Sequence, residues 1–398
     1  MRRLRWHVVV WAMILVVIGL RASLSKKVDG VYPIFSTAGR QWLAGETAYI
    51  PPAADLDIYR YSPPITAFFA PWTLLPERLA CVLWRGFNAA IFLGGLLVWC
   101  RARRPAVDTA AMLLVIPLAV GGLNNAQCNA FDSGMLLFAA AAFVNGFWTT
   151  AAACASVPVL FKGYPLALGL LLGLVEPKRF APRLVICLLI GAAVPFCCQR
   201  PAFVFDEYAA FFSRLAGDDR TQFEFVAGYR DLHMLLRRYG LPLSLMAYRI
   251  VEIVLGGACA AIILWGRARG WDRRTAAEAC VWLGLCWMTV AGPATESCTY
   301  VLISPVLAVA VLTAKDRPRW QQSLVGASFV LFTVAAASVW FPGWFAHPIQ
   351  ATAIQPLGAL FLSIWVLVEL GRSLHASPAA DHFFSTFGKS ANSSRTAA

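Results

Sequence analysis

The stretch "SPPITAFFAPWTLLP" at residues 62–76 decides how this chain is threaded through a membrane. It is apolar, but four prolines interrupt it. If it were a full span, the basic cluster "RARRP" at 101–105 would lie outside, and every later basic cluster would be inverted with it. We therefore expect a helix lying on the outer membrane surface, with its aromatic rings at the level of the lipid headgroups.

The composition indicates a chain that is surrounded mainly by lipid. Of its 398 residues, 59% are hydrophobic and 14% are charged, whereas a soluble domain carries about 25% charged residues. Apolar runs recur from end to end, and they are long and lack the alternation of barrel strands. Because only helices and closed barrels can span a bilayer, the sequence predicts an all-α polytopic membrane protein.

Charge and motifs exclude several other classes of protein. The net charge of +13 arises from short basic clusters between apolar runs, which is typical of cytoplasmic loops and does not call for a nucleic-acid partner. The eleven cysteines lie mostly inside apolar runs without CxxC spacing, so no disulfide framework or metal centre is predicted. The chain has no Walker-type phosphate loop and no GxGxxG fingerprint, so ATP hydrolysis is not expected.

Placing the basic clusters and the N-terminus in the cytoplasm predicts about twelve crossings with both ends inside. The first apolar run is interpreted as an uncleaved helix, with a cleaved signal peptide as the alternative. The membrane domain then covers 1–371, with large outer loops at 25–77 and 199–240 and a disordered cytoplasmic tail over 372–398. The predicted crossings are 8–24, 78–100, 106–122, 130–147, 149–161, 164–175, 183–198, 241–266, 275–291, 299–313, 321–341 and 350–370. The short pair within 149–175 is alternatively a pair of half-membrane helices.

The first outer loop carries a second predicted surface helix at 31–44, where apolar positions alternate with Arg40 and Gln41. Short segments around these two helices occur in a recognisable order, each following the last along the chain. They are "DGVYPIF" (29–35), "YRYSPPITAFFAPWTLLP" (59–76), "LWRGFN" (83–88), "NNAQCNAF" (124–131) and "FKGYPLALGLLLGL" (161–174).

In these segments the sequence resembles the glycosyltransferase 87 family of polyprenyl-phosphate-dependent mannosyltransferases, over roughly residues 1–310. The resemblance implies a GT-C type glycosyltransferase fold, a polyprenyl-phosphate-linked hexose donor and transfer on the outer face of the cytoplasmic membrane. One departure is clear. Many family members carry a tryptophan-histidine segment in a late outer turn, and here that turn reads "AGPATESCTYVLISP" (291–305), without histidine.

The resemblance also implies a catalytic role for Asp29, since GT-C enzymes are similar in placing an acid just past the first helix. Inverting sugar transfer needs one general base for the acceptor hydroxyl, and the phosphate leaving group needs cations. The alternative is a solvated loop acid or a helix cap. Asp55 and Asp57 form a DxD pattern in the same loop and are an alternative base or metal ligand, although no metal is indicated.

Three basic residues are candidates for the donor phosphate. Lys162 sits in the apolar setting "PVLFKGYPLAL", where a lysine is costly and marks a functional site by default. The alternative for Lys162 is snorkelling to the headgroups. Arg60 and Arg230 are further candidates, each with the alternative of a plain loop charge.

Polar residues in the turns are candidates for the sugar or the acceptor, because amides both donate and accept hydrogen bonds. They have the alternative of simple helix capping. The candidates are Tyr61, Asn125, Gln127, Asn129 and Glu296.

The sequence therefore predicts an inverting membrane hexosyltransferase, with mannose as the expected sugar and a lipid or glycan as the acceptor. Its partners are the lipid-linked donor, that acceptor and membrane lipids. A secondary transporter or lipid flippase is the rival function, but the chain shows no clear internal repeat.

Overall fold

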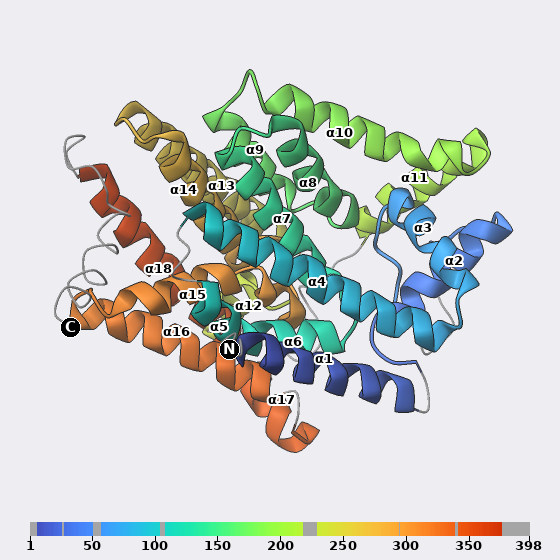
Figure 1. The fold of residues 1–398 in the computed structure, drawn as a ribbon, viewed down its shortest axis with the longest axis horizontal. Helices are drawn as coiled ribbons and strands as arrows, with labels where there is room; N and C mark the ends of the chain where they lie inside the picture. The colour runs from blue at the N-terminus through green and yellow to red at the C-terminus, as the bar shows by residue number, and fades with distance from the viewer. Residues whose placement is uncertain are drawn as a thin grey trace, which may run out of the picture.

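The computed structural model describes residues 6–25, 28–50, 57–103, 108–217, 229–293, 295–338 and 341–375. Within these ranges every regular element is helical (Figure 1). The first elements are α1 (Trp6–Leu24), α2 (Tyr32–Ala44), α3 (Pro63–Phe69), η1 (Pro71–Leu74), α4 (Glu77–Arg103), α5 (Asp108–Leu114), α6 (Ile116–Asn124), α7 (Asn129–Val144), α8 (Trp148–Phe161) and α9 (Leu166–Val175). The rest are α10 (Ala181–Ala193), η3 (Val194–Cys197), α11 (Pro201–Gly217), α12 (Leu232–Arg238), α13 (Leu245–Ala268), α14 (Arg273–Val290), η4 (Ser297–Val301), α15 (Ser304–Ala314), α16 (Arg319–Ser338), α17 (Gly343–Ala351) and α18 (Ile354–His375).

Among the described residues, five helices are long and apolar enough to cross a membrane: α1, α4, α13, α16 and α18. They match five of the predicted crossings, and the chain is a multi-pass membrane protein. The predicted count of twelve is not confirmed, because the remaining apolar helices have only 10–17 residues. A helix needs about 20 residues to cross the hydrocarbon core.

The predicted crossing at 106–122 is two helices rather than one. The chain breaks at Val115, between α5 and α6, and Pro117 lies in the first turn of α6. Proline has no N–H for the helical hydrogen bond, but it is well tolerated in a first turn. The proline therefore favours a new helix start over a continuous span.

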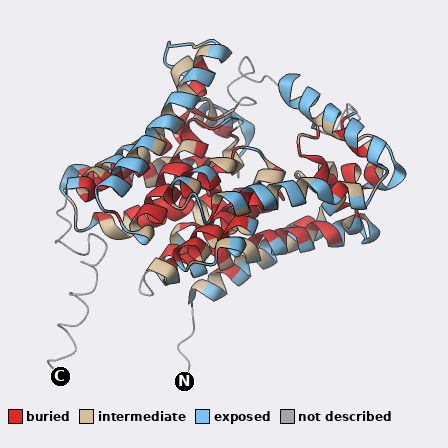
Figure 2. Cartoon of the chain, turned by 90° about the horizontal axis from the view of Figure 1, so that it is seen from above, coloured by how far each residue is buried: buried red, intermediate tan, exposed pale blue. Residues whose placement is uncertain are grey.

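The core is built from helices with apolar residues on every side. Most residues of α7, α14 and α15 are buried, whereas α13 exposes Met246, Ile253 and Val254. Buried residues gather in the middle of the molecule and exposed residues on its outer helices (Figure 2). Exposed apolar residues on the outer helices are expected where lipid is the solvent. α4 and α7 touch backbone to backbone, since a Cβ on Gly95 would meet the carbonyl of Gly134.

One end of the bundle, which we call the pocket end, carries the first outer loop. Helices form at both segments predicted there, as α2 and as α3 with η1, and both begin with proline in the first turn. α2 ends at Gly45, whose φ of 70° suits a residue without a side chain. α2, α3 and α11 gather on the right of Figure 1. Their placement on a membrane surface stays a prediction.

Aromatic rings fill the space between this loop and the helices beneath it. Phe35 of α2 stacks on Phe69 of α3 at 4.3 Å between ring centroids, and Phe69 meets Trp84 of α4 at 4.8 Å. Phe161, at the end of α8, stacks on Trp84. Aromatic contacts of this kind stabilise by about 0.5–1.5 kcal/mol beyond the area they bury, so the loop is fixed to the bundle.

The opposite end, which we call the basic end, is where α4, α7 and α18 finish and where α14 and α16 begin. Arg103 of α4 pairs with Glu278 of α14, and Arg273 of α14 donates to the carbonyl of Val144 at the end of α7. Arg317, just before α16, pairs with Glu369 of α18 at 2.7 Å. Several of the basic clusters therefore lie on one side of the bundle. α18 continues to His375, and the tail beyond it lies outside the described residues.

Candidate active site

The site begins with the turn between α6 and α7, which α4 holds in place. The indole of Trp84 donates to the carbonyl of Ala126, and the guanidinium of Arg85 donates to the carbonyl of Asn124 at 2.8 Å. Asn88, one turn further on, accepts from the N–H of Phe131 in α7. The segment "LWRGFN" thus presents two polar groups to the turn and one to the first turn of α7.

Asp29 lies against the same turn. Its carboxylate forms an ion pair with Arg85 at 2.8 Å, and its side chain is 33% exposed. The next residue, Gly30, has a φ of 77°, and a Cβ there would collide with the carbonyl of Asn125. The N–H of Val31 donates to that carbonyl at 2.8 Å. Asp29 is therefore fixed in position by Arg85 and by the close backbone approach.

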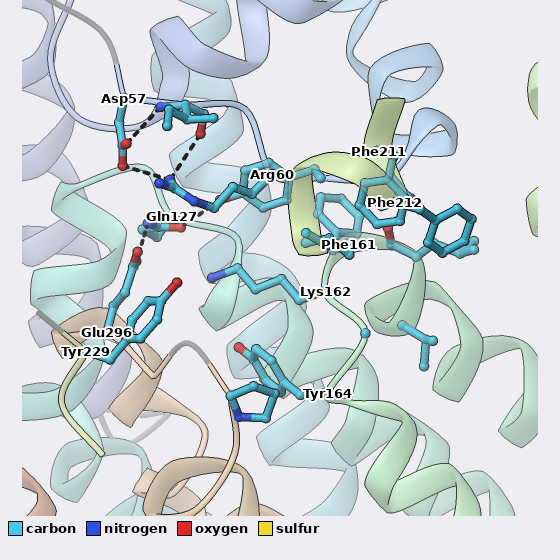
Figure 3. A pocket seen from close by; sticks show the side chains of 18 of the residues that line it. Asp57, Arg60, Gln127, Phe161, Lys162, Tyr164, Phe211, Phe212, Tyr229 and Glu296 are labelled. Atoms are coloured by element: carbon cyan, nitrogen blue, oxygen red, sulfur yellow. Dashed lines mark hydrogen bonds and ion pairs between the residues drawn. The ribbon is translucent and has the colours of Figure 1, made fainter. Parts of the chain in front are cut away.

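A pocket of about 790 Å³ opens between the first outer loop, the joint of α8 and α9, and the helices α11 to α14 (Figure 3). Lys162 reaches into it from the joint, where the chain leaves α8 in an extended conformation. Its ammonium donates to Oδ1 of Asn129 at 3.0 Å and lies 5.9 Å from the centroid of the Tyr61 ring. Arg60 lines the same pocket and pairs with Asp57 at 3.1 Å.

A chain of polar side chains continues from Lys162 across the pocket wall. The hydroxyl of Tyr61 donates to Oε1 of Gln127 at 3.2 Å. The amide nitrogen of Gln127 donates to Oε2 of Glu296 at 3.1 Å. Phenol, amide and carboxylate stand side by side here, which is the donor and acceptor mixture that sugar hydroxyls require.

The far wall is acidic. Asp231, which caps α12, and Glu252 of α13 both line the pocket, with Arg249 beside them. Burial raises the pKa of the Asp231 carboxyl to about 6. The aromatic rings of Tyr248 and Trp287 complete this wall.

The remaining part of the pocket is apolar. Phe161, Phe211 and Phe212 cluster at one side in Figure 3, whereas Arg60, Gln127 and Glu296 lie at the other. The pocket is therefore amphipathic. Lys162 lies between its polar and apolar parts.

The structure brings six of the predicted site residues into the pocket lining: Asp57, Arg60, Tyr61, Gln127, Lys162 and Glu296. Asn129 holds Lys162 from behind. Three predicted residues lie beside the pocket lining and not in it. They are Asp29, Asn125, whose amide faces the Cys298 sulfur, and Arg230. Asp55 lies outside the described residues.

Arg230 is engaged elsewhere in the fold. Its guanidinium donates to Gln350 of α17 at 3.1 Å and to Gln355 of α18 at 3.4 Å. Its backbone N–H donates to the carbonyl of Thr295, and its carbonyl accepts from the hydroxyl of Tyr300. These contacts tie the second outer loop to the C-terminal helices.

Sequence reasoning missed Arg85, Asp231 and Glu252, and also the phenylalanines of the apolar part. The arginine stood inside a quoted motif, so its position within an apolar helix was the available signal. The acids gave no comparable signal, because nothing in their neighbours shows that they face Lys162 across a pocket. Among the described residues, no group of three or more His, Cys, Asp or Glu side chains could hold a metal ion.

The protein is thus all-helical in its described part, with a partly polar, partly apolar pocket at one end. The family model of glycosyltransferase family 87 matches residues 59–305, more than half of the chain. The chain therefore belongs to glycosyltransferase family 87 and is a membrane glycosyltransferase.

A crystal structure of ArnT from Cupriavidus metallidurans bound to undecaprenyl phosphate is similar over 93% of this chain and 77% of that chain. Its sequence identity is 14% and its TM-score is 0.40. No curated protein matches the chain. The family assignment accordingly rests on the family model alone.

Proposed function

We propose that this glycosyltransferase transfers a hexose, with mannose as the expected sugar, from a polyprenyl-phosphate donor to a lipid or glycan acceptor. The observation that carries the proposal is the position of Lys162 between the polar and apolar parts of one pocket. A polyprenyl-phosphate sugar has the same division, with a charged phosphate between a polyol and a long hydrocarbon. The GT-C type of fold and a site on the outer face of the cytoplasmic membrane belong to the same proposal.

The donor fits the pocket in one direction. Its phosphate lies at Lys162, with Arg60 as a second cation at the rim, since phosphates favour charge-assisted hydrogen bonds. Its first isoprene units lie against Phe161, Phe211 and Phe212. The sugar then faces Tyr61 and the polar chain that leads to Glu296.

The acceptor enters along the acidic wall. Asp231 and Glu252 accept hydrogen bonds, so they suit an acceptor that offers hydroxyl groups. An anionic acceptor would meet like charge on this side of the pocket. The cations Lys162 and Arg60 and the acids Asp231 and Glu252 thus give the donor phosphate and the acceptor separate places.

The reaction is a single displacement at the anomeric carbon. An acceptor hydroxyl oxygen forms the new bond to that carbon, the bond to the phosphate oxygen breaks, and the phosphate leaves with the bonding electrons. Lys162 stabilises the charge that develops on the phosphate. A carboxylate takes the hydroxyl proton, and we assign this role to Asp29, with Glu296 as the alternative because it lies in the pocket wall. No resident cofactor is part of the proposal.

The test is transfer by purified protein from radiolabelled polyprenyl-phosphate mannose, with a lipid extract as acceptor. Lys162→Ala is expected to raise the donor KM about 10- to 100-fold, because a hydrogen bond to a charged group contributes about 1.5–3 kcal/mol. Lys162→Arg should retain more donor use. Lys178→Ala removes an exposed lysine far from the pocket and is the matched control.

Two outcomes would contradict the proposal. An unchanged donor KM in Lys162→Ala would show that Lys162 does not bind the donor phosphate. Transfer from a nucleotide sugar, with none from the polyprenyl-phosphate sugar, would replace the donor class.

A further inference from the structure

The first turn of α7 holds buried polar atoms that the proposed reaction does not use. Both carboxylate oxygens of Asp132 and the amide nitrogen of Asn129 are buried and lack hydrogen-bond partners in the described part of the chain. The Cys128 thiol approaches Asp132. Asp132 is fully buried. A buried carboxyl group is costly in its charged form, so it is either protonated or compensated by an opposite charge.

Lys162 is the cation at that place. Its ammonium donates to Asn129, and Asn129 and Asp132 are three residues apart, on one face of α7. In the described part of the chain no ion pair joins the two side chains, and Lys162 acts on the Asp132 carboxyl group from a greater distance. Asp132 does not line the pocket, whereas Lys162 does. The carboxylate therefore lies behind the lysine as seen from the pocket.

The other titratable groups that face Lys162 are the phenols of Tyr61 and Tyr164, the thiol of Cys128 and the carboxylate of Glu296. Glu296 lies on the pocket side, where it accepts from Gln127. The other charged groups in the pocket lining are Asp57, Arg60, Asp231, Arg249 and Glu252.

We propose that Asp132 is a positioning residue, the buried counter-charge that keeps Lys162 charged and aimed into the pocket while the donor is absent. The inference rests on the proposed function, because it takes Lys162 as the phosphate contact. Asp132 does not touch the substrate. The arriving phosphate meets a lysine already oriented by Asn129 and Asp132, and the ammonium then lies between two anions.

The first test is the kinetics of Asp132→Asn, which keeps the shape and removes the charge. We expect the donor KM to rise about tenfold with kcat changed less than twofold, and to rise more steeply at alkaline pH than in the wild type. Asp132→Glu should restore the wild-type pH profile even if its stability is lower. Ser133→Ala alters a buried polar residue in the same turn and is the control.

A double-mutant cycle shows whether Asp132 acts through Lys162. In a Lys162→Ala background, Asp132→Asn should leave the donor KM unchanged. Two independent, additive losses would overturn the inference. So would an Asp132→Asn variant that folds normally and keeps the wild-type KM at every pH.

Thermal unfolding in detergent gives a readout that needs no activity. Lys162→Ala leaves Asp132 buried without a counter-charge and should lower Tm, and adding Asp132→Asn should recover most of the loss. If Lys162→Ala does not change the donor KM, the phosphate contact of the proposed function fails, and the Tm cycle alone decides the charge pair. A double variant no more stable than Lys162→Ala overturns the pair as well.

Discussion

The two ends of the bundle both contain buried charge, but they arrange it differently. At the basic end, the buried acids Glu278 and Glu369 each meet an arginine from a distant segment of the chain. At the pocket end, Lys162 meets an amide and phenols, and Asp132 behind it has no hydrogen bond in the described part of the chain. At the basic end these acids are paired with arginines. At the pocket end Asp29 and Asp57 are paired with arginines too, but Lys162 has no ion pair in the described part of the chain and is available to an incoming anion.

This difference separates stability from function. Removing one partner of a closed buried pair leaves a charge uncompensated and lowers stability. Removing a charge from an open pocket should act mainly on substrate use. The predictions below test this division, in order of decreasing effect.

The largest effect is expected at Asp29. Asp29→Asn keeps the shape of the side chain but cannot accept a proton, so turnover should fall by about 10²- to 10⁴-fold. Donor binding should be largely kept, because Asp29 lies beside the pocket lining and not in it. Single-turnover transfer with purified protein, together with donor binding, measures both quantities.

Two matched variants sharpen this prediction. Asp57→Asn changes a pocket carboxylate that is 53% exposed and should have a small effect. Glu296→Gln should weaken sugar binding but retain turnover. Should Glu296→Gln be inactive while Asp29→Asn transfers normally, Glu296 is the base and Asp29 only fixes the turn.

The second effect concerns stability at the basic end. Glu369→Gln breaks contacts with Arg317 at 2.7 Å and with Arg372 at 2.9 Å. The free energy of unfolding should fall by about 3 kcal/mol, at the low end for a buried pair, because both arginines keep some contact with water. The donor KM should not change. Asp316→Asn, an exposed acid on the same side, should change stability by less than about 0.5 kcal/mol. An altered donor KM in Glu369→Gln would contradict the view that the ion pairs of the basic end serve stability alone.

The smallest effect is a pH dependence at Asp231. Burial raises the pKa of this carboxyl to about 6 in the folded protein, so the folded state holds the proton more tightly than the unfolded chain. Stability should therefore fall as pH rises from 4 to 6, and Asp231 should contribute about 2 kcal/mol to that fall. Asp231→Asn, which can still cap α12, should be less sensitive to pH by this amount. The free energy of unfolding is measured in urea at several pH values. An equal dependence on pH in the wild type and in Asp231→Asn would contradict the prediction.

Local pattern predicted much of the chain. Proline and amphipathic spacing predicted helices at 31–44 and 62–76, and α2, α3 and η1 occupy them. An isolated lysine in an apolar run predicted a functional role for Lys162. The polar turn residues and Glu296 were grouped because both lay between apolar runs on one expected side, and Gln127 does bond to Glu296.

What the sequence could not supply depends on contacts between distant segments. Asp29 and Arg85 are 56 residues apart, and their pairing follows from the fold of the 124–128 turn. Asp132 looks like an ordinary first-turn acid until burial shows that water does not reach it. The predicted number of crossings is not confirmed for a related reason, because a run of 10–17 apolar residues can be a half-span or a core helix.

The backbone contact at Gly95 and Gly134 fixes the position of α4 along α7. With 27 residues it is about 40 Å long, against about 30 Å for the hydrocarbon core of a bilayer. Its first turns, which hold the 124–128 turn through Trp84 and Arg85, cannot slide relative to α7. The distance from the pocket to the Gly95–Gly134 contact is thus set within the protein, whatever the thickness of the membrane around it.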